Sequence, residues 1–374
     1  MMQLFNRNIY VMNSRNIGLN AQPQELEVKY PEKTVLKGKT LIELEKWCIE
    51  QNQTSFRGRQ LFEWIYRHGE NNALKMTNIS EKFRNFINNE CILSVLDLEK
   101  QSDSHNEPTI KYLFRLQDGN FIETVSMIED NRHTVCLSSQ VGCNVGCTFC
   151  ATASMGFIRN LTTGEIVEQL EYVRKNVESP ITNVVFMGMG EPMLNYKNVM
   201  ISADIFHDHL GYGLASSRIT ISTAGVIPKI IQFVEEKRKY KLAISLNAPS
   251  DEIRKKIMPI NNTWNIAELI VAVRPFMNRK RRNIMFEYVL MKDINDSRED
   301  AHKLMRIIKG LNCKLNIIPY NETDGEYKRP SDEIIEIFIQ ILIKNQKKFR
   351  FRVLVRWSKG QDINAGCGQL VVLQ

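Results

Sequence analysis

The sequence predicts an α/β protein built on a partial (β/α)6 barrel of the TIM type, with a small helical domain and a β-hairpin before it. From residue 133 onward, six apolar, β-branched runs alternate with amphipathic stretches of helix length, the pattern of repeated β-α units. The runs are TVCLSS, NVVFMG, RITIST, KLAISL, IMFEYVL and KLNIIPY. Because a closed barrel of this type has eight units, six predict an incomplete one, which we place at residues 133–348.

The chain before the barrel divides into three predicted parts. Residues 1–35 are rich in Asn and carry no acidic residue before Glu25, so we expect a flexible tail, with a targeting segment as the alternative. Residues 36–100 repeat apolar side chains with helical period and form the helical accessory domain. Residues 101–132 form a hairpin linker, because two alternating runs meet at Asp118-Gly119.

The chain is expected to end, over residues 349–374, in a strand and a glycine-punctuated loop that holds Cys367. With 50 Lys and Arg against 42 Asp and Glu, the chain carries a net charge of +8, which suits a polyanionic partner. No apolar run is long enough to cross a membrane and no secretory signal is visible, which predicts a cytoplasmic protein without membrane contact. Its cysteines are then expected to be reduced thiols.

The segment CNVGCTFC places three of the eight cysteines, Cys143, Cys147 and Cys150, within eight positions. A structural zinc site usually draws on a second cysteine pair, which the chain lacks, and an odd number of thiols cannot all pair as disulfides. Three thiolates suit an iron–sulfur cluster in which one iron has no protein ligand. The segment follows the first barrel strand, at the end of the barrel where active sites form.

Five motifs resemble one family of radical S-adenosylmethionine enzymes, the RlmN-type RNA methyltransferases. They are CLSSQVGCNVGCTFCATASMGFIRNL, FMGMGEPMLN, ITISTAGV, AISLNAP and DINAGCGQL. The resemblance implies a [4Fe-4S] cluster and a radical SAM barrel, two S-adenosylmethionine molecules per turnover, and methylation of adenosine C2 in 23S rRNA and in tRNA. It further implies a flavodoxin- or ferredoxin-type electron donor and a monomeric enzyme.

The resemblance also assigns the reacting side chains. Cys367 matches the cysteine that carries the methyl group, and Cys136 matches the one that resolves the covalent link to RNA. Adenine C2 is electron-poor, so a carbon radical can add to it where an ordinary nucleophilic attack on a methyl sulfonium cannot occur. Strand alternation in FIETVSM turns Glu123 inward, and burial raises the pKa of a carboxyl, as a general base near neutrality requires.

The cofactor pocket is expected at the ends of the barrel strands. Glycines after the strand NVVF would let the backbone approach a ligand, and the carboxylate of Glu191 could bind the ammonium of S-adenosylmethionine. Asn247 replaces the histidine of the usual motif and Gly366 the alanine. The expected lining residues are Gly190, Glu191, Ser222, Ser245, Leu246, Asn247 and Asn321.

RNA contact is expected from Arg57, Arg59 and Arg67 in FRGRQLFEWIYRH, although such arginines often form solvated surface ion pairs instead. Two rival functions remain open from the sequence. One is a methyltransferase of adenosine C8 in 23S rRNA, of the class that confers antibiotic resistance, against which Pro192 in GMGEP speaks. The other is a non-catalytic RNA-binding protein stabilised by its metal, in which Cys136 and Cys367 would have no role.

Overall fold

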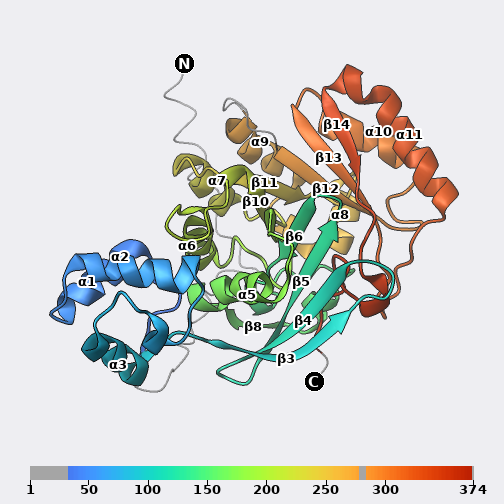
Figure 1. Cartoon of the computed structure of the whole chain (residues 1–374). Helices are drawn as coiled ribbons and strands as arrows, with labels where there is room; N and C mark the ends of the chain where they lie inside the picture. Colours follow the sequence, from blue (N-terminus) through green and yellow to red (C-terminus); the bar gives the residue numbers. More distant parts are fainter. Residues whose placement is uncertain (1–32, 278–283, 373–374) are drawn as a thin grey trace, which may run out of the picture.

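The computed structural model describes residues 33–277 and 284–372 (Figure 1). Residues 1–32 of the predicted tail, and with them the question of a targeting segment, lie outside the described residues. The last two positions of that predicted tail belong to the helical domain, because β1 (Thr34–Val35) pairs in parallel with β2 (Cys91–Ile92).

The accessory domain is helical, as its apolar period predicts. Its first helix begins at a capping box, in which the Thr40 side chain accepts the N–H of Glu43 and the Glu43 carboxylate accepts the N–H of Thr40. The second helix continues into one π-helical turn. The domain consists of α1 (Leu41–Glu50), α2 (Ser55–Phe62), the π-turn Glu63–Arg67, the 3-10 turn Ala73–Lys75 and α3 (Glu81–Glu90).

One ten-stranded sheet forms the frame of the molecule, in the order β14-β13-β12-β11-β10-β9-β6-β5-β4-β3. The six predicted barrel strands are confirmed, and all neighbours from β6 to β13 run parallel. The final strand extends this parallel set, since β14 pairs with β13. The bounds are β6 (Arg132–Cys136), β9 (Asn183–Phe186), β10 (Ile219–Thr223), β11 (Lys241–Ser245), β12 (Ile284–Leu290), β13 (Cys313–Pro319) and β14 (Phe351–Val355).

The predicted hairpin is present, and it is part of the barrel sheet rather than a separate linker. Strands β4 (Thr109–Leu116) and β5 (Phe121–Glu129) pair antiparallel across the Asp118-Gly119 turn, and β5 continues the sheet from β6. An additional edge strand, β3 (Leu96–Asp103), pairs with β4 and takes residues 96–100 out of the predicted helical domain. Its sequence LDLEKQSD shows no regular alternation because most of its side chains are exposed.

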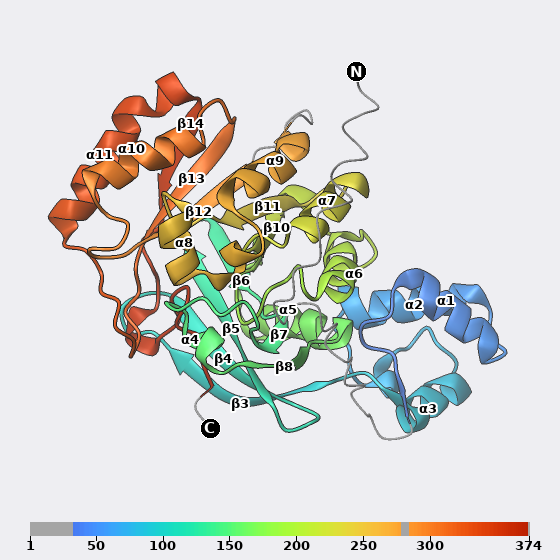
Figure 2. The same cartoon turned by 180° about the vertical axis from the view of Figure 1, so that it is seen from behind.

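Helices cover the outer side of the parallel strands, and the mouth of the barrel faces the cluster loop (Figures 1 and 2). A small second sheet, of β7 (Gln140–Gly142) and β8 (Phe157–Asn160), encloses that loop together with α4 (Ala151–Ser154). Of the described residues, no helix is long and apolar enough to cross a membrane. The larger helices are α5 (Thr163–Asn176), α6 (Tyr196–His207), α7 (Ile227–Glu235), α8 (Asp251–Ile257), α9 (Ile266–Met277), α10 (Arg298–Ile307) and α11 (Asp332–Phe349), and short 3-10 turns lie at Ser216–Arg218, Pro259–Asn262 and Gln361–Ile363.

The accessory domain is fastened to α5 by buried polar contacts. The Nζ of Lys37 lies 2.8 Å from the Glu171 carboxylate, and both side chains are almost fully buried. One turn earlier, Glu168 accepts the backbone N–H groups of Val95 and Leu96, which lead from the domain into β3. Charges buried in this way are tolerated when paired and hydrogen-bonded, so α5 sets the orientation of the domain beside the barrel.

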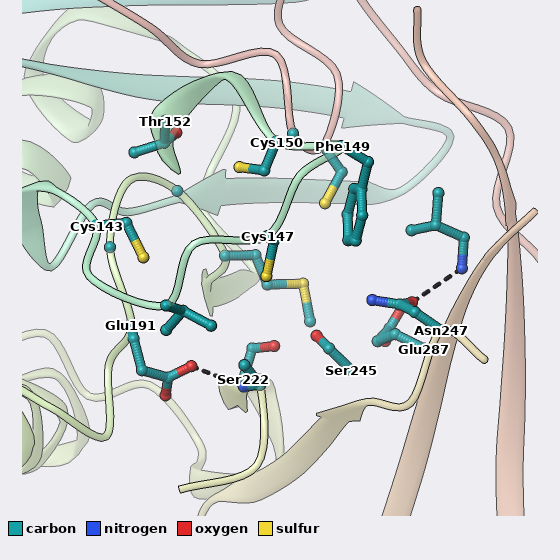
Figure 3. A pocket seen from close by; sticks show the side chains of 18 of the residues that line it. Cys143, Cys147, Phe149, Cys150, Thr152, Glu191, Ser222, Ser245, Asn247 and Glu287 are labelled. Carbon is teal, nitrogen blue, oxygen red and sulfur yellow. Dashed lines mark hydrogen bonds between the residues drawn. The ribbon is translucent and has the colours of Figure 1, made fainter. Parts of the chain in front are cut away.

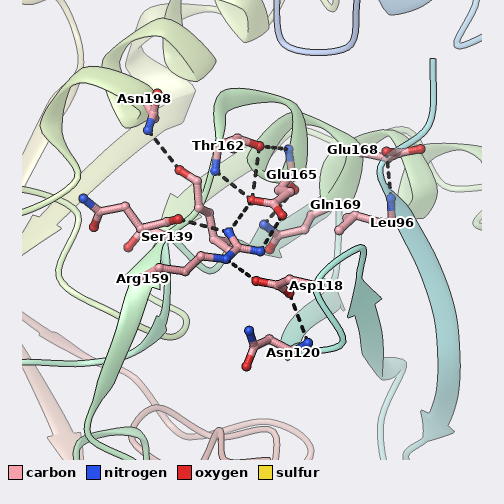
Figure 4. Close-up of polar contacts among 12 residues, drawn as sticks. Leu96, Asp118, Asn120, Ser139, Arg159, Thr162, Glu165, Glu168, Gln169 and Asn198 are labelled. Carbon is pink, nitrogen blue, oxygen red and sulfur yellow. Dashed lines mark hydrogen bonds and ion pairs between the residues drawn. The ribbon is translucent and has the colours of Figure 1, made fainter. Parts of the chain in front are cut away.

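A second buried network joins the hairpin turn to the barrel (Figure 4). The guanidinium of Arg159 binds Glu165 through both Nη atoms, at 2.9 and 2.8 Å, and donates from Nε to Asp118 at 2.5 Å. The Glu165 carboxylate also accepts the N–H of Thr162 as part of a capping box at the start of α5. Arg159 thus connects the β4–β5 turn, β8 and α5.

Replacing Arg159 with Met should therefore destabilise the fold. The variant would leave the Glu165 carboxylate buried without its cation, which costs about 3 kcal/mol or more of the free energy of unfolding. Urea denaturation measures the loss. The matched control is Arg115→Met on β4, where an exposed pair with Glu99 at 3.7 Å should contribute less than about 1 kcal/mol. Equal losses in the two variants would contradict the assignment.

Candidate active site

The three cysteines of CNVGCTFC lie on one loop between β7 and α4 (Figure 3). The loop is fixed at both ends and in the middle. The N–H of Cys143 donates to the carbonyl of Gly156 at 2.7 Å, that of Thr148 to Ile257 at 3.0 Å, and that of Ala151 to Gly368 at 2.8 Å. The last contact joins the loop to the C-terminal segment, so the cysteine loop and the Cys367 loop are held together.

A cavity with about 880 Å³ of open space lies between this loop and the ends of the barrel strands. The residues from the sequence-predicted site that line it are Cys143, Cys147, Cys150, Gly190, Glu191, Ser222, Ser245, Asn247 and Cys367. The fold thus brings together on one wall three thiols, and opposite them the polar groups from the ends of three strands, β9, β10 and β11.

The donor set fits a cluster better than a single ion. In the described part of the chain, no group of three or more Cys, His, Asp or Glu side chains is placed to hold one metal ion directly. The thiols instead border a common space. Burial raises the pKa of Cys143 to about 12 and that of Cys147 well above its ordinary value, so iron bound there would supply the positive charge that their thiolate forms require.

Gly190 and Glu191 lie where the strand β9 meets the cavity. The backbone of Gly190 has φ 94°, and a Cβ there would lie 2.4 Å from the Cβ of Gln140, so only glycine fits this close approach. The Glu191 carboxylate accepts the N–H groups of Met193 at 2.9 Å and Ala224 at 2.7 Å. Burial raises the pKa of this carboxyl to about 7, despite those hydrogen bonds.

The backbone conformation and hydrogen bonds of Asn247 account for asparagine at this position of the family motif. Its φ is 55°, in the left-handed region that Asn tolerates better than most residues. The side-chain Oδ1 accepts the N–H of Val289 at 3.0 Å, and the backbone carbonyl accepts from the Asn295 amide. Asn247 therefore joins β11 to β12 at the cavity wall, and its neighbour Leu246 is wholly buried in the core rather than on the cavity surface.

Asn321 also lies off the cavity wall, and it holds the C-terminal loop instead. Its Nδ2 donates to the carbonyl of Cys367 at 3.0 Å. The other departure from the motif, Gly366, is adjacent, and a Cβ there would lie 2.7 Å from that same Nδ2 and 2.6 Å from the Oε1 of Gln369. In this chain glycine lets both amide side chains close over the loop, whereas alanine would displace them.

Cys367 borders two cavities at once. It lines the cavity of the three cysteines and also a smaller second cavity, which Cys136 lines from β6. The Cys367 residue is exposed, whereas Cys136 is 7% exposed. Burial raises the pKa of Cys136 to about 12. The structure thus places the two cysteines, 231 positions apart in the sequence (367 minus 136), on the wall of one space.

Glu123 is inward-facing and buried, as strand alternation predicts, but it is not free. The Nζ of Lys111 lies 2.9 Å from its Oε1, and its Oε2 accepts the N–H of Val371 at 3.0 Å. Burial raises the pKa of Glu123, while Lys111 opposes the shift. Val371 follows Leu370, which borders both cavities, so the carboxylate lies beside the end of the Cys367 loop.

The Cys367 loop closes the gap that the incomplete barrel leaves. On the hairpin side, Ser104 and the N–H of His105 donate to Asp362, and Lys111 donates to the carbonyl of Asn364. On the other side, Gln369 donates to the carbonyl of Glu322, which follows β13. The loop is therefore hydrogen-bonded to both ends of the sheet, near the edge strand β3 on one side and after β13 on the other.

Two charged residues of the site escaped the sequence analysis. Glu287, on β12, lines the main cavity, and its Oε1 is buried without a hydrogen-bond partner among the described residues. Arg356, directly after β14, lines the second cavity. A signal was present for Glu287, since it is the one charged residue within the apolar run IMFEYVL. Arg356 sits among other arginines in FRFRVLVRW, where alternation cannot single it out.

The three arginines proposed for RNA contact all have partners within the chain. Arg57 donates to the carbonyl of Asn78 at 2.9 Å and Arg67 to that of His209 at 2.6 Å. Arg59 lies 3.6 Å from Glu63 and keeps about half of its side chain, 51%, exposed. Of these arginines, Arg59 is the most available to a phosphate.

Comparisons with known proteins identify the family of the chain. Residues 137–305 match the radical SAM superfamily, and residues 34–93 match the N-terminal domain of ribosomal RNA large subunit methyltransferases. A probable dual-specificity RNA methyltransferase RlmN of Clostridium botulinum is 43% identical over 332 residues, 88% of this chain and 94% of that protein. The dual-specificity RNA methyltransferase RlmN of Geotalea uraniireducens is 41% identical over 340 residues, 91% of this chain and 97% of that protein.

A solved structure agrees as well. The crystal structure of a radical SAM methyltransferase from Sphaerobacter thermophilus superposes with a TM-score of 0.84 at 41% identity, covering 90% of this chain and 99% of that one. This match confirms the predicted fold class, and the relatives match almost the whole described chain. The chain belongs to the RlmN family of dual-specificity RNA methyltransferases.

Proposed function

We propose that this protein transfers a methyl group from S-adenosylmethionine to C2 of adenosine in 23S rRNA and in tRNA, with Cys367 as the carrier. The observation that supports it most is the position of Cys367 on the walls of both cavities. A thiol at that boundary can receive a methyl group from a cofactor in the main cavity and present it to a base in the second. The family relationship supports the choice of RNA as substrate.

Three thiolates, of Cys143, Cys147 and Cys150, would hold a [4Fe-4S] cluster with one iron free for S-adenosylmethionine. When bound, this pair of cofactors supplies the carbon radical that removes a hydrogen atom from the methyl group on Cys367. The chain's own groups would position the second cofactor. Their set comprises Gly190, Glu191, Ser222, Ser245 and Asn247 on the cavity wall, with Leu246 and Asn321 supporting it from behind.

Glu123 is the proposed acceptor of the C2 proton. Its raised pKa and its place beside Leu370 support this role. Lys111 stabilises the carboxylate at rest, so the proton must compete with an ammonium 2.9 Å away. Cys136 is the proposed second thiol, which separates the methylated base from Cys367; its place in the same cavity as Cys367 supports this.

The test is nucleoside mass spectrometry of 23S rRNA and of tRNA after anaerobic incubation with reconstituted protein, S-adenosylmethionine and a reductant. We expect 2-methyladenosine in both RNAs. Finding 8-methyladenosine would instead assign the protein to the C8-modifying class, and an intact cluster without any methylation would contradict the proposal. The unmethylated product of the Cys367→Ala variant serves as the control.

We further propose a cytoplasmic monomer that receives electrons from a flavodoxin- or ferredoxin-type donor and contacts RNA through Arg57, Arg59 and Arg67. The family relationship supports the RNA partner, and the exposure of Arg59 makes it the first of the three to test. Reversing its charge should weaken RNA binding and reduce the salt dependence of the affinity. An unchanged salt dependence would remove Arg59 from the interface.

A further inference from the structure

The second cavity contains a cation that the reaction described above does not use. Arg356 follows β14, and its backbone N–H donates to the carbonyl of Ile317 at 2.9 Å, which fixes it at the end of the sheet. Its side chain lines the cavity together with Cys136 and Cys367. The remaining lining residues are Met127, Met187, Ala365, Gly366 and Leu370, all of them without charge.

The guanidinium of Arg356 has unusually weak partners for a half-buried cation. Its Nη1 lies 3.7 Å from the sulfur of Met187, and its Nη2 lies 4.0 Å from that of Met127. Within the described residues, no carboxylate lies within ion-pair distance of it. Thioether sulfurs are weak hydrogen-bond acceptors and carry no charge, so they accept from the guanidinium N–H groups without neutralising its positive charge. The charge of Arg356 therefore remains available to an anion in the cavity.

The charge of Arg356 acts on both thiols of that cavity, on Cys367 and on the more deeply buried Cys136. Burial raises the pKa of its thiol to about 12, and the two features that oppose burial are the charge of Arg356 and a hydrogen bond from the backbone of Met187. The thiol of Cys367 raises the pKa of Cys136 further. A thiol attacks only as its thiolate, and a neighbouring arginine increases the thiolate fraction.

We propose that Arg356 is a positioning residue that stabilises Cys136 as the thiolate which attacks the sulfur of Cys367. This rests on the proposed function. In the step, a bond forms between the two cysteine sulfurs while the bond from the Cys367 sulfur to the methylene carbon on adenine breaks. The electron pair of the broken bond passes to that carbon, which takes up a proton from water and becomes the methyl group. A dithiol reductant then returns the disulfide to two thiols.

The C-terminal segment carries both Arg356 and Cys367 to the side of Cys136. Arg356 and Cys367 are both on the C-terminal stretch, whereas Cys136 is on β6, at the far end of the parallel set. The docking of β14 onto β13 therefore brings the carrier thiol and the cation to Cys136 together. Glu287, which lines the main cavity, also attracts Arg356 electrostatically, but no hydrogen bond or ion pair joins the two side chains in the described part of the chain.

The test measures the reactivity of Cys136 directly, on the anaerobic holoenzyme without RNA or S-adenosylmethionine. Iodoacetamide alkylation of Cys136, located by peptide mass spectrometry in a Cys367→Ala background, is followed from pH 6 to pH 10. Arg356→Met should slow alkylation at pH 8 by about tenfold, because the loss of a cation raises the thiol pKa by about one unit. Arg356→Lys, which keeps the charge, should retain most of the rate.

Arg352→Met is the matched control, since this exposed arginine is on the same strand and its side chain does not line the cavity. A second readout uses turnover: Arg356→Met should still methylate Cys367 but accumulate enzyme joined to RNA on a denaturing gel. An unchanged alkylation profile would overturn the proposal, and combined with weaker RNA binding it would make Arg356 a phosphate contact. Because alkylation needs no RNA, it reports on Arg356 even if no 2-methyladenosine forms. If Arg356→Met does not fold, Arg356→Gln gives the same comparison.

Discussion

Cys136→Ala should produce an enzyme that forms a covalent link to its RNA and cannot release it. The variant keeps the three cluster cysteines, the main cavity and Cys367, so every step up to the addition to adenine can proceed. In the proposed mechanism release requires a second thiol, and Cys136 lines the second cavity together with Cys367. Release of 2-methyladenosine should fall by about 10²-fold or more.

Denaturing gel electrophoresis with labelled RNA measures the trapped species. It should appear in Cys136→Ala and disappear in the double variant Cys136→Ala, Cys367→Ala, because the link runs through Cys367. The matched control is Cys313→Ala, a buried cysteine on β13 outside both cavities. Normal release of methylated RNA from Cys136→Ala would show that another group resolves the link.

Cys147→Ala should abolish both the cluster and the activity. With two thiols in place of three, the cluster loses one of its protein ligands, and no other cysteine lines that part of the cavity except Cys367. We expect iron content and the visible absorbance of the reconstituted protein to fall to background, and no 2-methyladenosine to form.

Circular dichroism and thermal unfolding should separate this loss from misfolding. The cysteine loop is held by backbone hydrogen bonds of Cys143, Thr148 and Ala151, which the Cys147 substitution leaves in place. The fold should therefore remain, as it should in Cys48→Ala, which serves as a control from the accessory domain. Full iron content in Cys147→Ala would contradict the assignment of the cluster ligands.

The barrel could be predicted from the sequence because its strands are buried on both faces. Each strand is therefore a short apolar, β-branched run in the sequence, and the apolar residues of the helices between the strands repeat with the helical period. Strand β3 gave no such signal, since its exposed side chains are mostly polar. That β4 and β5 would join the barrel sheet could not be predicted either, because pairing partners are decided by contacts far apart in the sequence.

The site residues could be predicted where they belong to a sequence motif. They were harder to predict where single side chains from separate strands meet at the cavity. The three cluster cysteines, Glu191 and Asn247 line one cavity as expected. Leu246 and Asn321 do not reach it, because strand alternation turns the first into the core and the second binds the backbone of Cys367. Glu287 and Arg356 became visible only once the strands were placed side by side.

The position of Cys367 after the last strand has a consequence for the order in which the protein is made. The cluster loop, the accessory domain and nine of the ten strands of the sheet precede β14 in the chain, so a polypeptide still emerging from the ribosome can complete them first. Only the final residues then close the barrel, through contacts with Ser104, Lys111 and Glu123. The residues in these contacts are far apart in the sequence; Glu123 and Val371, for example, are separated by 248 positions. Closure at such separation is a late event in folding. A chain made only as far as β13 therefore lacks both Arg356 and Cys367, the proposed methyl carrier, and the proposed chemistry cannot begin until Cys367 has been added.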